Sequence, residues 1–127
     1  MKTTLGQYCI NVSNLERSVH FYEEVLGLTV KQRIEIEGTS EVLLWGGEGT
    51  TLQLAWQHDH KGPIDHGNAF WKLYIHSDDC KGLYDRAIAA GSESVREPQR
   101  LDRWPVTAAF IKDPDGYEIE ILENHEA

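Results

Sequence analysis

The chain has 127 residues, 40% of them hydrophobic and 26% charged, a composition typical of one globular domain rather than a disordered chain. Its formal net charge of −9 disfavours nucleic acid and anionic membranes as partners, because phosphate binding requires a surplus of Lys and Arg. No apolar run approaches the roughly 20 residues that span a bilayer, and the first residues do not resemble a signal peptide. Two cysteines are too few for a disulfide framework, which indicates a protein of the reducing cytoplasm.

The first predicted elements are a strand and a helix. Residues 7–12 (QYCINV) alternate polar and apolar side chains, which indicates a half-buried strand. The apolar residues that follow share one helical face: Leu15, Val19, Tyr22 and Leu26. Ser13 and Glu16 have the spacing of a capping box, and Gly27 is expected to end the helix.

A hairpin is expected over residues 43–56 (LLWGGEGTTLQLAW), where two apolar segments flank a turn that contains glycine. The next stretch, residues 57–68 (QHDHKGPIDHGN), contains Gly and Pro and is expected to be a linker. It also holds His58, His60 and His66. In an extended segment His58 and His60 would share a face and could bind a metal ion, although a polar linker is the interpretation that we favour.

The second half of the chain has the same order of elements. Residues 72–77 (KLYIHS) indicate a strand, and an amphipathic helix follows, capped by Asp78 or Asp79 and ended by Gly91. Residues 110–123 (FIKDPDGYEIEILE) then indicate a hairpin with an Asp-Gly turn.

The two hairpins form an internal repeat, because at a constant offset Gly49 falls on Gly116 and the strands after them match. The repeated unit is a strand, a helix and three strands. We therefore expect an α+β fold in which two βαβββ modules form a curved mixed sheet around a cup. The modules are placed at about residues 5–57 and 69–124 of a single domain, residues 1–127.

Alternation along the strands predicts which side chains line this cup, since successive side chains point to opposite faces. The residues expected in the pocket are Gln7, Cys9, Asn11, Gln53, Gln57, Lys72, Tyr74, His76 and Glu120. Trp104 is added because it lies in a loop expected at the pocket rim. Trp45 and Trp56 are expected in the core, whereas Trp71 and Trp104 fit either the core or the pocket edge.

Two motifs resemble the vicinal oxygen chelate superfamily, which includes glyoxalase I, extradiol dioxygenases and bleomycin-binding proteins. Residues 14–27 (NLERSVHFYEEVLG) are close to the family pattern D-L-x-R-S-x-x-F-Y-x-x-V-L-G. Residues 113–120 (DPDGYEIE) are close to the pattern D-P-D-G-x-x-I-E. The resemblance spans nearly the whole chain and implies the fold, which hosts many reactions.

The resemblance also implies four metal-ligand positions, which carry Gln7, Gln53, Lys72 and Glu120 in this chain. Gln7 and Glu120 are compatible with a metal ion, but Gln53 replaces an expected Glu and Lys72 replaces an expected His. An ammonium group has three hydrogen-bond donors and no lone pair. We therefore predict no cofactor and a degenerate metal site that disfavours zinc or nickel.

The same comparison predicts a catalytic pair. Lys72 and Glu120 could form a buried ion pair in the place of the metal, with a structural salt bridge as the alternative. Burial should lower the pKa of Lys72 and the carboxylate should raise it, so we predict no net shift. At the positions where glyoxalases hold glutathione, an expected Arg is replaced by Asn11 and an expected Asn by Gln57, which disfavours glutathione.

Two functions remain open from the sequence. One is a lyase or isomerase related to lactoylglutathione lyase, which acts on a small oxygenated metabolite through Lys72 and Glu120. The other is a metal-free drug- or antibiotic-binding protein of the bleomycin-resistance type, which sequesters a cationic aromatic compound. Both predict a small-molecule ligand. The resemblance further implies a homodimer, since two modules close one cup in this family, often across chains.

Overall fold

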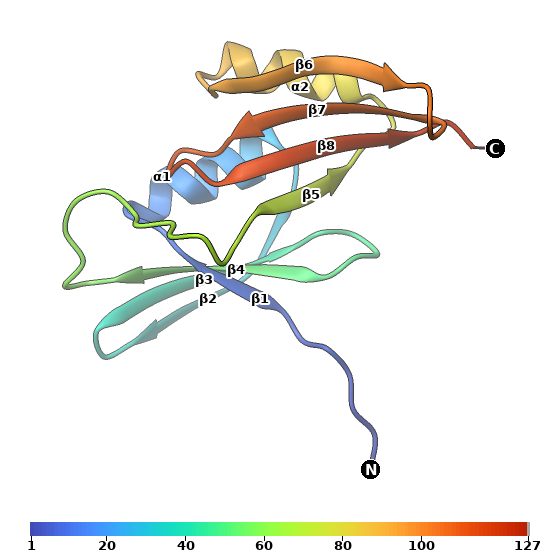
Figure 1. Cartoon of the computed structure of the whole chain (residues 1–127). Helices are drawn as coiled ribbons and strands as arrows, with labels where there is room; N and C mark the ends of the chain where they lie inside the picture. The colour runs from blue at the N-terminus through green and yellow to red at the C-terminus, as the bar shows by residue number, and fades with distance from the viewer. Residues whose placement is uncertain (127) are drawn as a thin grey trace. The chain divides into compact units, whose positions relative to one another are not determined.

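The structure is a computed structural model that describes residues 1–126. It divides into two compact units, Met1–Ile64 and Asp65–Ala127. Each unit contains a four-stranded sheet and one helical segment (Figure 1).

The first unit has a mixed sheet with the strand order β1-β4-β3-β2. Its elements are β1 (Tyr8–Asn11), α1 (Leu15–His20), the π-helix η1 (Phe21–Val25), β2 (Thr29–Ile36), β3 (Thr39–Trp45) and β4 (Thr51–Gln57). The first and last strands, β1 and β4, run parallel, whereas the β2–β3 and β3–β4 pairs are antiparallel.

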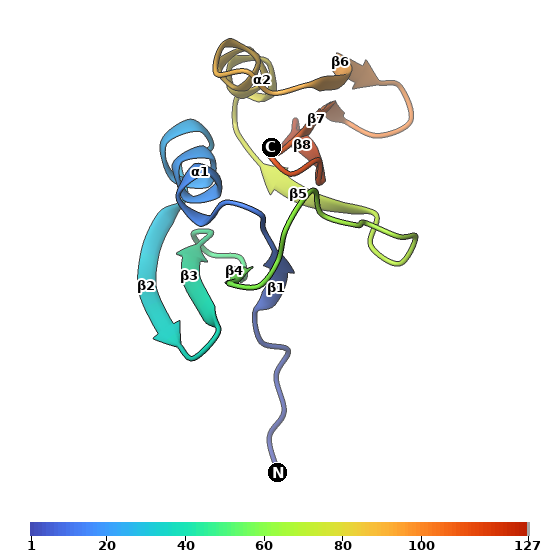
Figure 2. The same ribbon diagram turned by 90° about the vertical axis from the view of Figure 1, so that its left-hand side faces the viewer.

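The second unit repeats this topology with the strand order β5-β8-β7-β6. Its elements are β5 (Lys72–His76), α2 (Cys80–Ala89), β6 (Ser94–Leu101), β7 (Val106–Lys112) and β8 (Glu118–Asn124). Here β5 and β8 are parallel and the other neighbouring pairs are antiparallel. Figure 2 shows the strands of each sheet side by side, with the helix of each unit beside its own sheet. The predicted α+β fold, with a βαβββ pattern used twice, is confirmed.

The N-cap of the helical segment in the first unit lies one residue after the predicted cap, Ser13. Asn14 is the N-cap, because its side-chain oxygen accepts a hydrogen bond from the backbone N–H of Arg17 at 3.1 Å. The predicted capping box is wrong, since Glu16 instead forms a two-pronged ion pair with Arg33. After His20 the backbone continues as a π-helix, and Gly27 ends the segment with φ of 84°.

Each unit packs its helix against its own sheet, α1 on β3 and β4, and α2 on β6, β7 and β8. Alternation assigns most of the core side chains correctly. Those buried in the first unit include Val12, Val19, Tyr22, Val42, Leu44 and Leu54, and those in the second include Cys80, Tyr84, Ala87, Ile111, Ile119 and Ile121. This apolar burial is the main source of stability for each unit.

Two aromatic residues depart from the predicted core. Trp45 is 50% exposed, because it lies on the face of β3 opposite to Val42 and Leu44. Tyr8, one of the apolar side chains that alternate along residues 7–12 and indicate a half-buried strand, is 49% exposed. It begins β1, which is an edge strand and has a neighbour on one side only.

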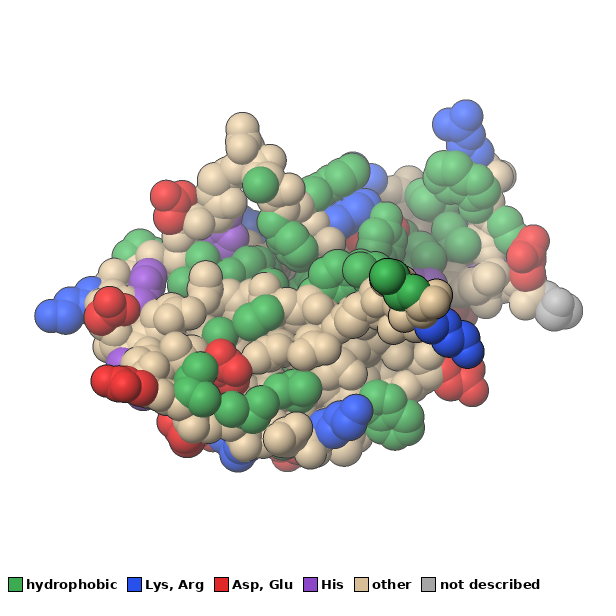
Figure 3. Space-filling model, turned by 90° about the horizontal axis from the view of Figure 1, so that it is seen from below, with side chains coloured by type: hydrophobic (Ala, Val, Ile, Leu, Met, Phe, Trp, Pro, Cys, Tyr) green, Lys and Arg blue, Asp and Glu red, His purple; other side chains and the backbone are tan. Residues whose placement is uncertain are grey.

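Acidic, basic and hydrophobic side chains are interspersed on the face seen in Figure 3. The negative net charge is therefore not gathered into one acidic patch on that face. Within residues 1–126, no helix is long and apolar enough to cross a membrane.

Candidate functional site

The polar residues expected in the cup of the first unit lie on neighbouring strands. The parallel register places Cys9 opposite Gln53 and Asn11 opposite Ala55. Gln7, immediately before β1, donates a hydrogen bond from Nε2 to Oε1 of Gln53 at 3.3 Å. Two of the four family ligand positions are therefore in direct contact within this unit.

Glu41 is a site residue that was not predicted from the sequence. It lies on β3, and its Oε1 accepts a hydrogen bond from Nε2 of Gln53 at 2.7 Å. Gln53 is thus held between Gln7 and Glu41, with its amide oxygen toward Gln7. Alternation along β3 would have found Glu41, because it is the charged member of the face opposite to Val42 and Leu44.

Asn11 and Gln57, the two residues expected at glutathione-contact positions, are also in contact with each other. Gln57 donates from Nε2 to Oδ1 of Asn11 at 3.3 Å, and its own Oε1 accepts from the hydroxyl of Thr39 at 3.2 Å. Cys9, on the same face, is exposed rather than packed. Partial burial and the nearby Glu41 carboxylate raise the pKa of the Cys9 thiol, which makes it a poor nucleophile at neutral pH.

In the second unit, Lys72 and Glu120 form an ion pair with Nζ and Oε1 2.6 Å apart. Lys72 is the first residue of β5, and Glu120 lies on the parallel neighbour β8, in register with Tyr74. Both charged side chains are only 10% exposed. A buried pair of this kind requires the two partners to compensate each other's lost hydration.

Aromatic rings surround the Lys72 ammonium. Its Nζ atom is 4.0 Å from the ring centroid of Trp71, 4.9 Å from that of Tyr74 and 5.2 Å from that of Phe110. Cation–π attraction to these ring faces adds to the attraction of Glu120.

The pKa of Lys72 is raised, so the predicted cancellation is wrong. Desolvation is the largest single effect and lowers the pKa. The hydrogen bonds and charge interactions with Glu120 and Tyr74 together outweigh it. Lys72 therefore remains an ammonium at neutral pH.

A row of side chains across all four strands passes through Glu120. The register places Tyr74 and Phe110 on either side of Glu120, and Arg96 next to Phe110. The Arg96 guanidinium lies 5.6 Å from the Phe110 ring centroid. Phe110 and Arg96 were not predicted as site residues, because a strand pattern gives faces but not the register between strands.

The residues at the family ligand positions do not fit a divalent metal ion. Lys72 is protonated and has no lone pair to offer, and Oε1 of Glu120 accepts its hydrogen bond, so Oε2 is the oxygen of this pair that Lys72 does not engage. The amides of Gln7 and Gln53 are bound to each other. Within residues 1–126, no group of three His, Cys, Asp or Glu side chains is arranged to hold a metal ion.

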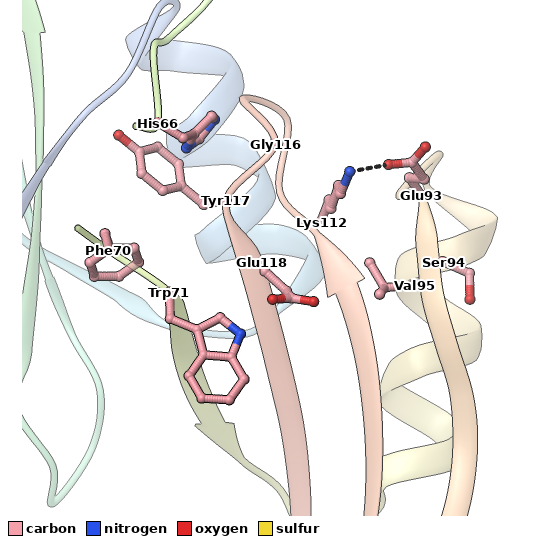
Figure 4. A pocket seen from close by; sticks show the side chains of 10 residues that line it. All are labelled: His66, Phe70, Trp71, Glu93, Ser94, Val95, Lys112, Gly116, Tyr117 and Glu118. Carbon is pink, nitrogen blue, oxygen red and sulfur yellow. Dashed lines mark ion pairs between the residues drawn. The ribbon is translucent and has the colours of Figure 1, made fainter. Parts of the chain in front are cut away.

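A cavity of about 590 Å³ opens in the second unit beside the ion pair. Figure 4 shows the cavity with Trp71 and Glu118 at one side and the Lys112–Glu93 ion pair, 3.0 Å long, at the other. The residues that line it are His66, Phe70, Trp71, Glu93, Ser94, Val95, Lys112, Gly116, Tyr117 and Glu118. Of these, Trp71 also contacts Lys72, so the cavity and the ion pair are adjacent.

The remaining pocket residues of the second unit are exposed. His76 ends β5, with its ring centroid 6.5 Å from that of Tyr74. Trp104 is 57% exposed in the turn between β6 and β7, beneath the Arg103 guanidinium at 5.4 Å. Trp71 is 73% exposed, so both of the tryptophans left unassigned by the sequence lie at the surface.

The histidines of the predicted linker are bound separately. His58 contacts the Ser40 hydroxyl at 2.7 Å, His60 contacts the carbonyl of Gly62, and His66 contacts the carbonyl of Asp115. The segment after β4 turns, so His58 and His60 do not share the face of an extended chain.

Ser40 and His58 do not form a nucleophilic pair. The single hydroxyl proton of Ser40 is donated to Oε2 of Glu35 at 2.6 Å, since a carboxylate can only accept. Nε2 of His58 must then donate to the Ser40 oxygen. The imidazole is therefore not placed as a base for the hydroxyl, as a catalytic triad requires.

Comparison with known proteins places these features in a family. Residues 4–121 match the model of the glyoxalase/bleomycin resistance protein/dioxygenase superfamily. The chain is 33% identical to a probable lactoylglutathione lyase of Vibrio cholerae, covering 93% of this chain and 88% of the relative. It is 32% identical to a lactoylglutathione lyase of Neisseria meningitidis, covering 90% and 86%. The trypanothione-dependent glyoxalase I of Leishmania major has a similar structure, with a TM-score of 0.82 and 26% identity over 96% of this chain and 87% of that one.

The chain therefore belongs to the glyoxalase/bleomycin resistance protein/dioxygenase superfamily, the vicinal oxygen chelate superfamily that its sequence motifs resemble. Within this superfamily it is a glyoxalase-like protein.

Proposed function

We propose that this glyoxalase-like protein is a lyase or isomerase that acts on a small oxygenated metabolite without a metal ion. Lys72 and Glu120 are its reacting groups. The observation that carries the proposal is their buried ion pair, with its 2.6 Å contact and a raised lysine pKa. Perturbed, paired and buried groups of this kind are concentrated at functional sites.

The proposed chemistry is a proton transfer next to a carbonyl group. Oε1 of Glu120 is bound by Lys72, which leaves Oε2 to accept a proton from the carbon beside the substrate carbonyl. The electron pair of that C–H bond moves to the carbonyl oxygen and gives an enolate, which the Lys72 ammonium stabilises by hydrogen bonding. The carbon that loses the proton carries a hydroxyl group, so the enolate is an enediolate. The hydroxyl proton passes to the former carbonyl oxygen, the first carbon becomes the new carbonyl, and Glu120 returns its proton to the former carbonyl carbon, which isomerises the substrate.

The relatives support this proposal. The relative from Neisseria meningitidis is named a lactoylglutathione lyase, and the one from Vibrio cholerae a probable lactoylglutathione lyase. Glutathione is not part of the proposal. The hydrogen bond from Nε2 of Gln57 to Oδ1 of Asn11 joins the two residues expected at the glutathione positions to each other.

The test is proton exchange in heavy water. After treatment with a chelator, the protein is incubated with methylglyoxal, with and without glutathione, and deuterium incorporation and product formation are followed by NMR. We expect turnover that persists without metal and falls more than about a hundredfold in Lys72→Met and Glu120→Gln, since a general base contributes roughly 10²–10⁴-fold. Turnover that requires added zinc or nickel would overturn the proposal.

A binding protein of the bleomycin-resistance type is the second candidate function. It is favoured by the negative net charge and by the exposed tryptophans Trp71 and Trp104, which suit a cationic aromatic ligand. Saturable binding of such a compound, with no turnover of any oxygenated metabolite, would favour this candidate over the first.

We make three further proposals, on the ligand-binding residues, the oligomeric state and the location of the protein. The cup-face residues of each unit take part in ligand binding, the active protein is a homodimer, and it resides in the cytoplasm. The free thiols of Cys9 and Cys80 support a reducing location.

A further inference from the structure

Glu118 is a carboxylate without a partner in the cavity of the second unit. It begins β8, and in Figure 4 its carboxylate lies beside the Trp71 indole at the cavity wall. Among residues 1–126, no side chain forms a hydrogen bond or ion pair with the Glu118 carboxylate. A partly buried carboxylate in this position loses hydration that no protein group restores.

The charges around the cavity leave one negative charge uncompensated. The register places Glu118 between Lys72 and Lys112 on neighbouring strands. Each lysine already has a carboxylate of its own, because Lys72 pairs with Glu120 at 2.6 Å and Lys112 with Glu93 at 3.0 Å. Glu118 is the carboxylate that remains, so the cavity is complementary to one positive charge.

The cavity walls indicate what carries that charge. Phe70 and Trp71 are 42% and 73% exposed, and Tyr117 contributes a third ring. Aromatic faces attract organic cations and provide apolar contact for the groups attached to them. A calcium or magnesium ion is a poor fit, since such ions take at least six oxygen ligands. The cavity of about 590 Å³ is large enough for a ligand of drug size.

We propose that this cavity binds the ammonium group of an organic amine, with Glu118 as its counter-charge. The apolar part of the amine lies on the rings of Trp71 and Phe70. The proposal deepens the second candidate function and rests on it, because it names the ligand class and the residues of a binding site.

The test uses benzylammonium as the probe, with benzyl alcohol as a neutral analogue of similar shape. Calorimetric titration of the whole protein should give saturable binding of benzylammonium at least about tenfold tighter than that of benzyl alcohol, equivalent to ~1.4 kcal/mol. Glu118→Gln should remove this preference while keeping the size of the side chain. The charge interaction should also weaken as salt is added.

The matched control is Glu97→Gln, which removes the same charge from the exposed surface of β6 in the same unit. It should leave benzylammonium binding unchanged, and circular dichroism should show that both variants fold. Equal binding of the two probes, no binding of either, or an unchanged preference in Glu118→Gln would overturn the proposal. Saturable binding of both probes without a preference for benzylammonium would remove the role of Glu118 and leave the binding function standing, whereas binding of neither probe would also count against the binding function.

Discussion

The Nζ atom of Lys72 lies 2.6 Å from Oε1 of Glu120, and each side chain is 10% exposed. Removing one partner leaves the other charge buried, so Lys72→Met should lower the free energy of unfolding by about 3–5 kcal/mol. The double variant Lys72→Met with Glu120→Leu buries no charge and should regain most of this loss. Urea denaturation of the three proteins measures both changes, and equal stability of the single and double variants would argue against a buried pair.

The raised pKa of Lys72 predicts a loss of stability in alkali. A group whose pKa is higher in the folded state stabilises the protein fully below its unfolded pKa and ceases to do so as the pH rises through the folded value. The free energy of unfolding should therefore fall above about pH 10.5, the ordinary value for lysine, more steeply in the parent than in the double variant. Parallel slopes in the two proteins would show that Lys72 does not titrate in this way.

The two cysteines should differ in reactivity. Cys80 is fully buried, and burial together with Glu123 and Asp79 raises its pKa to about 11. Cys9 is exposed, and its pKa is also raised, by partial burial and by Glu41. Iodoacetamide should add one label to the folded chain, at Cys9, at a rate that rises with pH. Glu41→Gln should accelerate this labelling. Mass spectrometry locates the label, and labelling of Cys80 in the folded chain would contradict the prediction.

A homodimer is expected in solution. Each sheet has two edge strands, and apolar side chains such as Ile36 on β2 and Val95 on β6 are about half exposed, at 54% and 46%. Pairing with a second copy would cover such edges. Analytical ultracentrifugation at micromolar concentration should give twice the 14.5 kDa mass of the chain. A single species at the monomer mass would contradict this expectation.

The fold was predictable from the sequence because the patterns that indicate its helices, strands and turns are periodic and involve residues close together in the chain. Apolar spacing locates the helix that contains Tyr22, and the Asp-Gly turn locates the hairpin at Gly116, which has φ of 91°. Alternation also assigns the buried face of Leu54 and Ile121. These signals depend on neighbours in the chain, and the repeat provides each of them twice.

The parts of the site that could not be predicted depend on the register between strands. The contact of Glu41 with Gln53 joins residues on different strands, and so does the place of Phe110 beside Glu120. The pKa of Lys72 depends on the balance between burial and its neighbours, which a linear pattern does not give. Trp45 was assigned to the core by its residue type, although its position in the alternation of β3 places it on the other face.

The parallel pairing of first and last strands bears on how the chain folds as it leaves the ribosome. Within residues 1–126, β4 is the one strand paired with β1, and β8 is the one strand paired with β5. The first strand of each sheet therefore has no partner until the last strand has been synthesised. The first unit can close while the second is still being made. In the second, β5 carries Lys72 unpaired through the synthesis of α2, β6 and β7, and the ammonium meets Glu120 only when β8 emerges.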